Sequence, residues 1–177
     1  NIIVPTITCI TTSVNLTAII GSLFNFTDAF APANWTLSNT NANGTVDTSS
    51  APASIAITGG NNGSNSSGTT SYSITMPMSG TLSFDWYYKT NDDAPEYDYP
   101  QMVYNGVTSF LTGFNKFGNK TQSGSVSIEV TAGETFELRM YTEDNVSGNA
   151  MVAISNFSLE LPFTGTPSYA WTASNGG

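Results

Sequence analysis

The stretch Gly80–Lys89, GTLSFDWYYK, decides the fold, because its side chains alternate between two kinds along the chain. One set is apolar or aromatic: Leu82, Phe84, Trp86 and Tyr88. The residues between them are polar apart from Tyr87. A period of two is the signature of a strand that buries one face and exposes the other. The stretch therefore predicts a β-strand lying against a core.

The same alternation recurs on both sides of this strand. Val126–Val130 and Phe136–Tyr141 flank Ala132-Gly133-Glu134, a turn signal, so we expect a hairpin there. Further strands are expected at Trp35–Ser38, Ser54–Thr58, Tyr72–Met78, Gln101–Tyr104 and Met151–Leu161. Gly59–Thr70, GGNNGSNSSGTT, is expected to be a flexible polar loop. Many short strands joined by Gly, Asn and Pro turns predict an all-β, antiparallel β-sandwich of the jelly-roll type.

The composition favours an extracellular or cell-surface protein. Charged residues make up 10% of the 177-residue chain, whereas Ser, Thr, Asn and Gly supply 81 positions. The net charge is −9, and the four basic residues are scattered. Nucleic acid and anionic membrane surfaces both need a basic footprint, so we expect neither as a partner. No apolar stretch reaches the length of a membrane span.

Catalytic motifs are missing from the sequence. The chain has no histidine, one cysteine (Cys9), and no zinc-ligand spacing or phosphate-binding loop. A pair of carboxylates, as in glycoside hydrolysis, is the remaining route to catalysis. We therefore expect a protein that is not an enzyme.

An acidic cluster follows the deciding strand, in the segment NDDAPEYDY at 91–99. Its carboxylates are Asp92, Asp93, Glu96 and Asp98, and Asp144 follows another expected strand. Calcium takes six to eight hard oxygen ligands, which such loops can supply. A solvated acidic loop explains the same residues. Both interpretations stay open, with these five residues as candidate ligands of a structural calcium ion.

Aromatic residues crowd the same part of the sequence. Trp86, Tyr88 and Tyr104 are expected in the core. The candidates for ligand contact are Tyr87 and Tyr141, on outward-facing strand positions, and Tyr97 and Tyr99, in the acidic loop. Aromatic rings cover the apolar face of a sugar while neighbouring polar groups bind its hydroxyls. A surface glycan or polysaccharide is the partner that this pattern suggests.

Several segments together resemble a jelly-roll module, similar to carbohydrate-binding modules, of large bacterial cell-surface adhesins. They are FNFTDAFAPANW at 24–35, SGTLSFDWYYKTND at 79–92, YNG at 104–106, SGSVSIEVTAGE at 123–134 and VAISNFSL at 152–159. The resemblance implies a displayed β-sandwich, in some relatives with a structural calcium ion. Many relatives carry Asp in an I-D-N-like segment near the last strand, where this chain has Ser155-Asn156. No calcium ligand is therefore carried over to that position.

The two ends differ from the middle. Residues 1–23 and 164–177 resemble pieces of an Ig-like or PKD-like repeat, and residues 24–163 form the expected jelly-roll module. The module is either inserted into such a repeat or lies between two neighbouring repeats. The Thr-rich segment Asn1–Ala18 also suits donation of a strand to another subunit.

Three functions follow from these observations. The first is an extracellular adhesion module of a large surface protein, stabilised by calcium, with carbohydrate as a candidate ligand and neighbouring repeats as partners. The second is a structural protomer of an extracellular filament assembled by strand exchange. The third is a carboxylate-dependent glycoside-processing enzyme, which we do not expect.

Overall fold

The structure, a computed structural model, describes residues 22–113 and 119–162 of the chain. Within these residues the elements are β1 (Ser22–Phe24), η1 (Asp28–Phe30), η2 (Pro32–Asn34), β2 (Thr36–Thr40), β3 (Thr45–Asp47), β4 (Ser54–Thr58), β5 (Gly68–Thr75), β6 (Gly80–Thr90), β7 (Asp98–Tyr104), β8 (Val107–Phe110), β9 (Thr121–Val130), β10 (Thr135–Thr142) and β11 (Ala150–Glu160). η1 and η2 are short 3-10 helices. The predicted segments Asn1–Ala18 and 164–177 lie outside the described residues, so their expected repeat or strand-exchange roles stay predictions.

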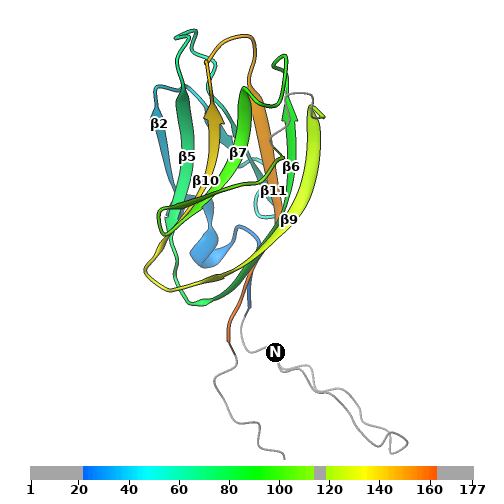
Figure 1. Ribbon diagram of the computed structural model, residues 1–177. Coiled ribbons are helices and arrows are strands. Elements are labelled where there is room, and N and C mark those ends of the chain that lie inside the picture. Colours follow the sequence, from blue (N-terminus) through cyan, green and yellow to red (C-terminus); the bar gives the residue numbers. More distant parts are fainter. Residues whose placement is uncertain (1–21, 114–118, 163–177) are drawn as a thin grey trace, which may run out of the picture.

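The strands form two antiparallel sheets that pack face to face (Figure 1). Sheet A has the order β3-β4-β11-β6-β9, with β1 also paired to β11, and sheet B has the order β2-β5-β10-β7-β8. The eight strands β4 to β11 divide equally between the two sheets. Their order is β4-β11-β6-β9 in sheet A and β5-β10-β7-β8 in sheet B. This is the jelly-roll arrangement. The described residues form an all-β jelly-roll sandwich, and this prediction is confirmed.

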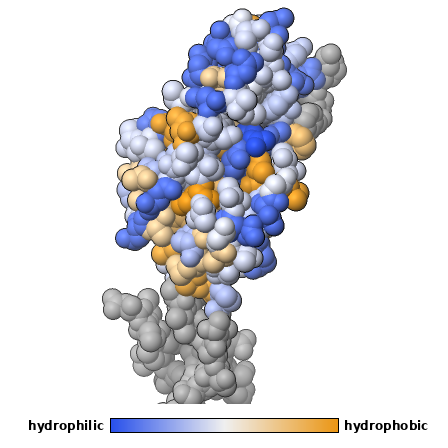
Figure 2. All heavy atoms as spheres, turned by 90° about the vertical axis from the view of Figure 1, so that its left-hand side faces the viewer, coloured by the Kyte–Doolittle hydropathy of each residue, from blue (hydrophilic) through white to orange (hydrophobic). Residues whose placement is uncertain are grey.

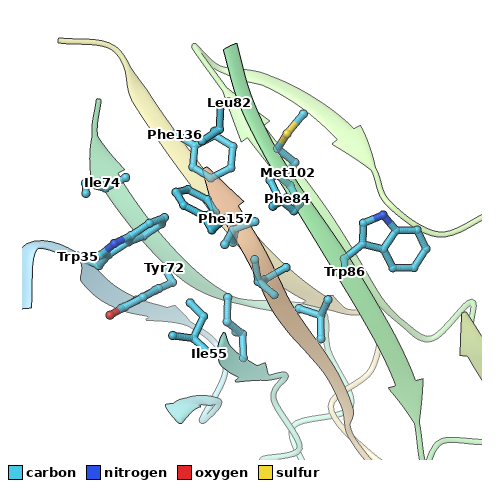
Figure 3. Packing of buried hydrophobic residues seen from close by; sticks show 14 of the residues in the cluster. Trp35, Ile55, Tyr72, Ile74, Leu82, Phe84, Trp86, Met102, Phe136 and Phe157 are labelled. Carbon is cyan, nitrogen blue, oxygen red and sulfur yellow. The ribbon is translucent and has the colours of Figure 1, made fainter. Parts of the chain in front are cut away.

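The core lies between the sheets and centres on Phe157 of β11 (Figure 3). Its ring lies 5.0 Å from that of Phe30, 6.0 Å from Phe84 and 6.1 Å from Phe136. Trp35 completes the cluster at 5.7 Å, and its indole Nε1 donates to the Phe30 carbonyl. The short 3-10 helices thus close one end of the sandwich with aromatic side chains.

A β-bulge in β11 puts Phe157 into this core. Val152 and Ile154 face inward before the bulge, whereas Phe157 and Leu159 face inward after it. The register with β6 shifts between Ser155 and Ser158, and Asn156 adopts φ 50°. An extra residue is what changes the phase of an alternating strand.

The expected hairpin between Val126–Val130 and Phe136–Tyr141 is wrong. β9 pairs with β6 in sheet A, whereas β10 pairs with β5 and β7 in sheet B. The turn instead bonds to Met76: Gly133 N donates to the Met76 carbonyl at 2.9 Å, and Met76 N donates to the Glu134 carbonyl at 2.8 Å. Alternation reveals which side chains face the core but not which strand lies alongside, so sequence neighbours were paired incorrectly.

The polar stretch Gly59–Thr70 is only partly a loop. Its last three residues begin β5, and Thr70 is fully buried. The exposed part is tied down, since Ser66 N donates to the Asp144 carbonyl at 3.0 Å and Gly63 N to the Asn145 carbonyl at 2.8 Å. These loops gather at the upper end of the sandwich in Figure 1, where Figure 2 shows mostly hydrophilic residues. Among the described residues, no helix is long and apolar enough to cross a membrane.

Gly80→Ala is expected to destabilise the sandwich by about 1–3 kcal/mol, the typical cost of overpacking. A Cβ at Gly80 would lie 2.2 Å from the carbonyl oxygen of Glu160, which is backbone and cannot rotate away. Gly113→Ala is the matched control, because no atom lies within 4 Å of its added Cβ. Urea unfolding of both variants gives the comparison, and equal midpoints would contradict the close approach of β6 and β11.

Candidate functional site

The outward-facing side of sheet B, called here the sheet B face, carries the most varied group of polar and aromatic side chains. Antiparallel pairing places Tyr99 of β7 opposite Tyr141 of β10 and Gln101 opposite Arg139. Thr69 and Ser71 of β5 continue these rows, because they pair with Tyr141 and Arg139. Side chains of opposed residues share a face. The sheet register therefore brings an aromatic pair, a cation and a row of hydroxyls together.

The tyrosine pair lies near the end of this face that adjoins the loops at 91–97 and 143–149, called here the loop end. The rings of Tyr99 and Tyr141 stack with centroids 5.1 Å apart and an interplanar angle of 24°. Phe110 of β8 lies on the far side of Tyr99 at 5.6 Å and is 48% exposed. The Tyr141 hydroxyl donates to Glu143 Oε2 at 3.1 Å. Since Tyr99 covers one face of the Tyr141 ring, the other face is turned toward β5 and its hydroxyls.

The polar groups beside the pair are held in place. Arg139 Nε donates to Glu137 Oε1 at 2.6 Å, and both side chains are partly exposed. Gln101 is buried, and within the described chain no donor reaches its Oε1. Burial raises the pKa of Tyr99 to about 12, with smaller contributions from the charge of Glu143 and from Tyr141. Its phenol therefore stays neutral at physiological pH.

A polar pocket of about 290 Å³ lies at the other end of the same face. Hydroxyls from three strands line it, together with the amide of Asn34 from η2. The lining residues are Ala29, Asn34, Thr36, Ser73, Ile74, Thr75 and Thr135. Between the pocket and Tyr141, β5 presents Ser71 and Thr69 outward, so polar groups run along the whole strand. At about 3.3 Å per residue, β5 from Thr69 to Thr75 spans about 20 Å.

The loop end also holds two buried carboxylates. Asp98 is fully buried at the start of β7, and Asp92 is 1% exposed in the loop before it. Among the described residues, no donor lies in good hydrogen-bond geometry to either oxygen of Asp98 or to Oδ2 of Asp92, although the Thr142 hydroxyl is near enough to Asp98 to lower its pKa. Asp92 Oδ1 accepts from the backbone N of Asp93. Thr90 and Thr142 lie buried beside them, so the core ends in a polar cluster at this end of the sandwich.

Burial is the main cause of the perturbed acidity of both carboxyl groups. It raises the pKa of Asp98 to about 7, and the charges of Asp92 and Asp144 raise it further while the hydroxyl of Thr142 opposes the shift. Burial also raises the pKa of Asp92, as do the charges of Asp144 and Asp93; the backbone N of Asp93 and, last, exposed Lys120 lower it. The charge of Asp92 thus disfavours ionisation of Asp98, and the charge of Asp144 disfavours ionisation of both carboxyl groups.

Two loops bring these carboxylates together. The loop at 91–97 is bonded to the loop at 143–149, since Glu143 N donates to the Tyr97 carbonyl at 2.6 Å and Asn91 N to the Asn149 carbonyl at 3.0 Å. Gly148 packs against the backbone of Asp92, where a Cβ would lie 2.9 Å from its N. The strand before Asp144 is therefore a neighbour of the acidic segment, which is the condition for Asp144 to contribute to one site with it.

The five candidate metal ligands do not share one environment. Asp92 and Asp98 are buried, Asp93 is exposed, and Glu96 and Asp144 are half-buried. Across residues 22–113 and 119–162, no group of three or more carboxylate, thiol or imidazole side chains is arranged to hold a metal ion. Any cation here needs backbone or hydroxyl oxygens in addition to carboxylates.

The four candidate aromatic residues also separate. Tyr99 and Tyr141 form the stacked pair, although Tyr99 belongs to β7 rather than to the loop. Tyr97 is half-buried in the loop, and Tyr87 lies on the outer side of sheet A, 44% exposed. Sequence reasoning missed three members of the sheet B face: Phe110, Gln101 and Arg139. Arg139 was detectable, because it shares the phase of Tyr141, but Gln101 and Phe110 needed the strand register.

Ser155-Asn156, the departure from the adhesin-like pattern, lies at the β11 bulge on the outer side of sheet A. Asn156 Nδ2 donates to Asp85 Oδ2 at 2.7 Å, and Ser125 Oγ donates to Asp85 Oδ1 at 2.6 Å. These bonds lower the pKa of Asp85. The three side chains tie β6, β9 and β11 together, which gives this carboxylate a structural role.

The comparisons with known proteins find solved structures of similar fold but no match by sequence. No family profile matches the sequence, and no curated protein matches it. A carbohydrate-binding module of the β-sandwich superfamily is 16% identical with a TM-score of 0.45; the match covers 78% of this chain and 62% of that one. A carbohydrate-binding module described for specific mannan recognition is 10% identical with a TM-score of 0.43, covering 80% and 100%. The enzymatically active domain of a bacteriophage CBA120 tailspike protein is 14% identical with a TM-score of 0.39, covering 77% and 21%.

These similarities are distant, and no residue role is carried over from them. This chain spans 62% of the first module and 21% of the tailspike chain. The solved structures that it resembles include several carbohydrate-binding modules.

Proposed function

We propose that the chain is an extracellular adhesion module, stabilised by calcium, whose sheet B face binds a neutral glycan. The observation that carries the proposal is the ring of Tyr141, which stacks on buried Tyr99 and has Arg139 in the next row and hydroxyls along β5 beside it. A sugar ring needs an apolar surface for its C–H groups and directional polar partners for its hydroxyls. The free face of Tyr141 and the side chains of Thr69 and Ser71 offer both.

The shape and charge of this face favour an extended, neutral ligand. Polar side chains continue from Tyr141 to the pocket lined by Asn34 and Thr75, which suits an oligosaccharide better than a single sugar. The chain carries a net charge of −9, and Glu137 already neutralises Arg139. A strongly acidic polysaccharide would therefore be repelled rather than attracted.

The setting outside the cell is supported by the composition and by the resemblance to adhesin modules. Solubility rests on hydroxyl and amide groups in place of charges, as is common in secreted β-proteins. The filament alternative depends on Asn1–Ala18, which lies outside the described residues. The catalytic alternative predicts turnover, so release of reducing ends from any bound polysaccharide would overturn the proposal of a binding module.

Tyr141→Ala is expected to weaken glycan binding by at least about tenfold, which corresponds to ~1.4 kcal/mol. The substitution removes the ring that the sugar would cover while leaving the buried core unchanged. A glycan array identifies the strongest neutral oligosaccharide, and isothermal titration calorimetry then compares the affinities of the wild type and the variant.

Tyr87→Ala is the matched control, because Tyr87 is also a half-exposed tyrosine but lies on sheet A. It should bind like the wild type. Equal losses in both variants, or no binding of any neutral glycan by the wild type, would contradict a glycan site on the sheet B face.

A further inference from the structure

We propose that Asp92 and Asp98 are ligands of a calcium ion that ties the 91–97 and 143–149 loops together and thereby fixes the tyrosine pair. This inference rests on the proposed function for its effect on glycan binding, whereas the cation site itself does not. Its basis is the pair of buried carboxylates at the loop end, three of whose oxygens have no hydrogen-bond partner among the described residues.

A buried carboxylate without donors is costly, and the neighbourhood offers two ways to remove the cost. One is protonation of Asp98. A single proton would neutralise one carboxyl group and could satisfy one acceptor, leaving the negative charges of Asp92 and Asp144 nearby. The other is a divalent cation, which neutralises two carboxylates together and uses several oxygens at once. Three carboxylate oxygens without a hydrogen-bond partner and three nearby acidic groups are more than one proton can satisfy, so these groups favour a cation.

Calcium fits the chemistry of this site better than a transition metal does. The chain has no histidine, and the side chains that gather here present oxygen atoms. Transition metals prefer imidazole or thiolate, whereas calcium binds carboxylate, carbonyl and hydroxyl oxygens. The hydroxyls of Thr90 and Thr142 and the backbone carbonyls of the two loops could complete the shell. Two carboxylates plus neutral oxygens agree with the finding that no three carboxylates converge.

The sheet register links this site to the tyrosine pair. Asp98 pairs with Thr142, and the next pair along β7 and β10 is Tyr99 with Tyr141. Successive residues point to opposite sides of a sheet, so the carboxylate lies on the core side, one residue along the strand from the pair. The loop bond from Glu143 N to the Tyr97 carbonyl and the bond from the Tyr141 hydroxyl to Glu143 continue the connection. Fixing the loops therefore fixes both rings, and a pre-organised surface binds with a smaller ordering cost.

The test begins with calcium alone, so its result does not depend on any glycan. Thermal unfolding at pH 8 is measured in EDTA and at calcium concentrations up to a hundred times the dissociation constant. The midpoint of the wild type should rise by about 5–10 °C at that ratio. Asp98→Asn and Asp92→Asn should lose the rise. Glu160→Gln removes one exposed negative charge at the far end of β11 and should keep it.

The two asparagine variants remain informative even if they change stability, because the readout is the difference between EDTA and calcium for each protein. No calcium shift in the wild type would overturn the cation site. An equal shift in Asp98→Asn would place the ion elsewhere and overturn these ligands.

The link to the tyrosine pair has its own readout. Hydrogen exchange at residues 97–99 and 141–143 should slow on adding calcium, in the wild type but not in Asp98→Asn. Glycan affinity should then fall about tenfold in EDTA. Slower exchange without any glycan binding would overturn the proposed function and leave the cation site standing, whereas unchanged exchange and unchanged affinity would overturn the link.

Discussion

Phe157→Ala should lower the free energy of unfolding by about 3–5 kcal/mol, the usual cost of deleting a buried phenylalanine ring. Phe157 is fully buried, and five other aromatic rings lie within about 6 Å of it, contributed by both sheets and by the 3-10 helices. Close packing lets the neighbours relax only partly into the space of the lost ring. Urea unfolding followed by tryptophan fluorescence measures the change.

Phe24→Ala is the control for this prediction, because Phe24 is 58% exposed on β1 at the edge of the same sheet. It should change the unfolding free energy by less than about 0.5 kcal/mol. A loss of less than about 1 kcal/mol in Phe157→Ala would contradict the position of Phe157 at the centre of the core, and with it the bulge that turns its side chain inward.

The fold class was predictable because alternating apolar and polar residues show which face of each strand is buried. Leu82, Phe84, Trp86 and Tyr88 are buried as the alternation of the deciding strand predicts. The strand at Ser54–Thr58 has the predicted bounds. These features are local, since each depends on a period of two within one segment. The core of a sandwich needs only that every strand present an apolar face.

Strand pairing was not predictable in the same way, because it depends on contacts between distant segments. The residues at 131–134 look like a hairpin turn, yet they carry the chain from sheet A to sheet B. The phase of β11 also changes within the strand, and the sequence signals this only by Asn156, a residue type that tolerates positive φ. A jelly roll is dominated by such non-local pairs.

Part of the candidate site was predictable from the sequence, and the part that depends on strand pairing was not. The sequence singled out Tyr141 by its outward-facing strand position, and Tyr99 by its place in the acidic segment, which stands out because only 10% of the residues are charged. Neither the stacking of the two tyrosines nor the burial of Asp98 can be read from composition, because both come from the β7–β10 register. The sequence alone treats the five carboxylates as equivalent, whereas the fold buries two of them.

In metal-free protein, the unfolding free energy should fall as the pH rises from about 4 to about 7. The pKa of Asp98 is raised to about 7 by burial, while an unfolded aspartate has a pKa of about 3.9. Between these values the folded protein holds a proton that the unfolded chain has released, so raising the pH favours unfolding. The slope can reach about 1.4 kcal/mol per pH unit.

The sign of this effect separates Asp98 from the other perturbed carboxyl groups. Hydrogen bonds from Ser125 and Asn156 lower the pKa of Asp85, and those from Ser49 lower that of Asp47. Their stabilising contributions are present at neutral pH and disappear as the pH falls through their lowered pKa values, below the window of Asp98. Stability in EDTA should therefore have its maximum on the acidic side of neutrality.

Urea unfolding in EDTA between pH 4.5 and 7.5 measures this dependence, with Asp98→Asn as the matched variant. The amide has the shape of the carboxyl group and no charge, so the variant should show a flatter profile and exceed the wild type in stability at pH 7.5. Saturating calcium should make the wild type more stable than Asp98→Asn at pH 7.5. The cation binds the ionised carboxylate, whose burial without a cation destabilises the wild type at this pH. A wild-type stability that rises with pH in EDTA would mean that Asp98 is ionised and satisfied without a metal ion. The same buried side chain thus links the acid–base behaviour of the module to the cation that we propose it binds.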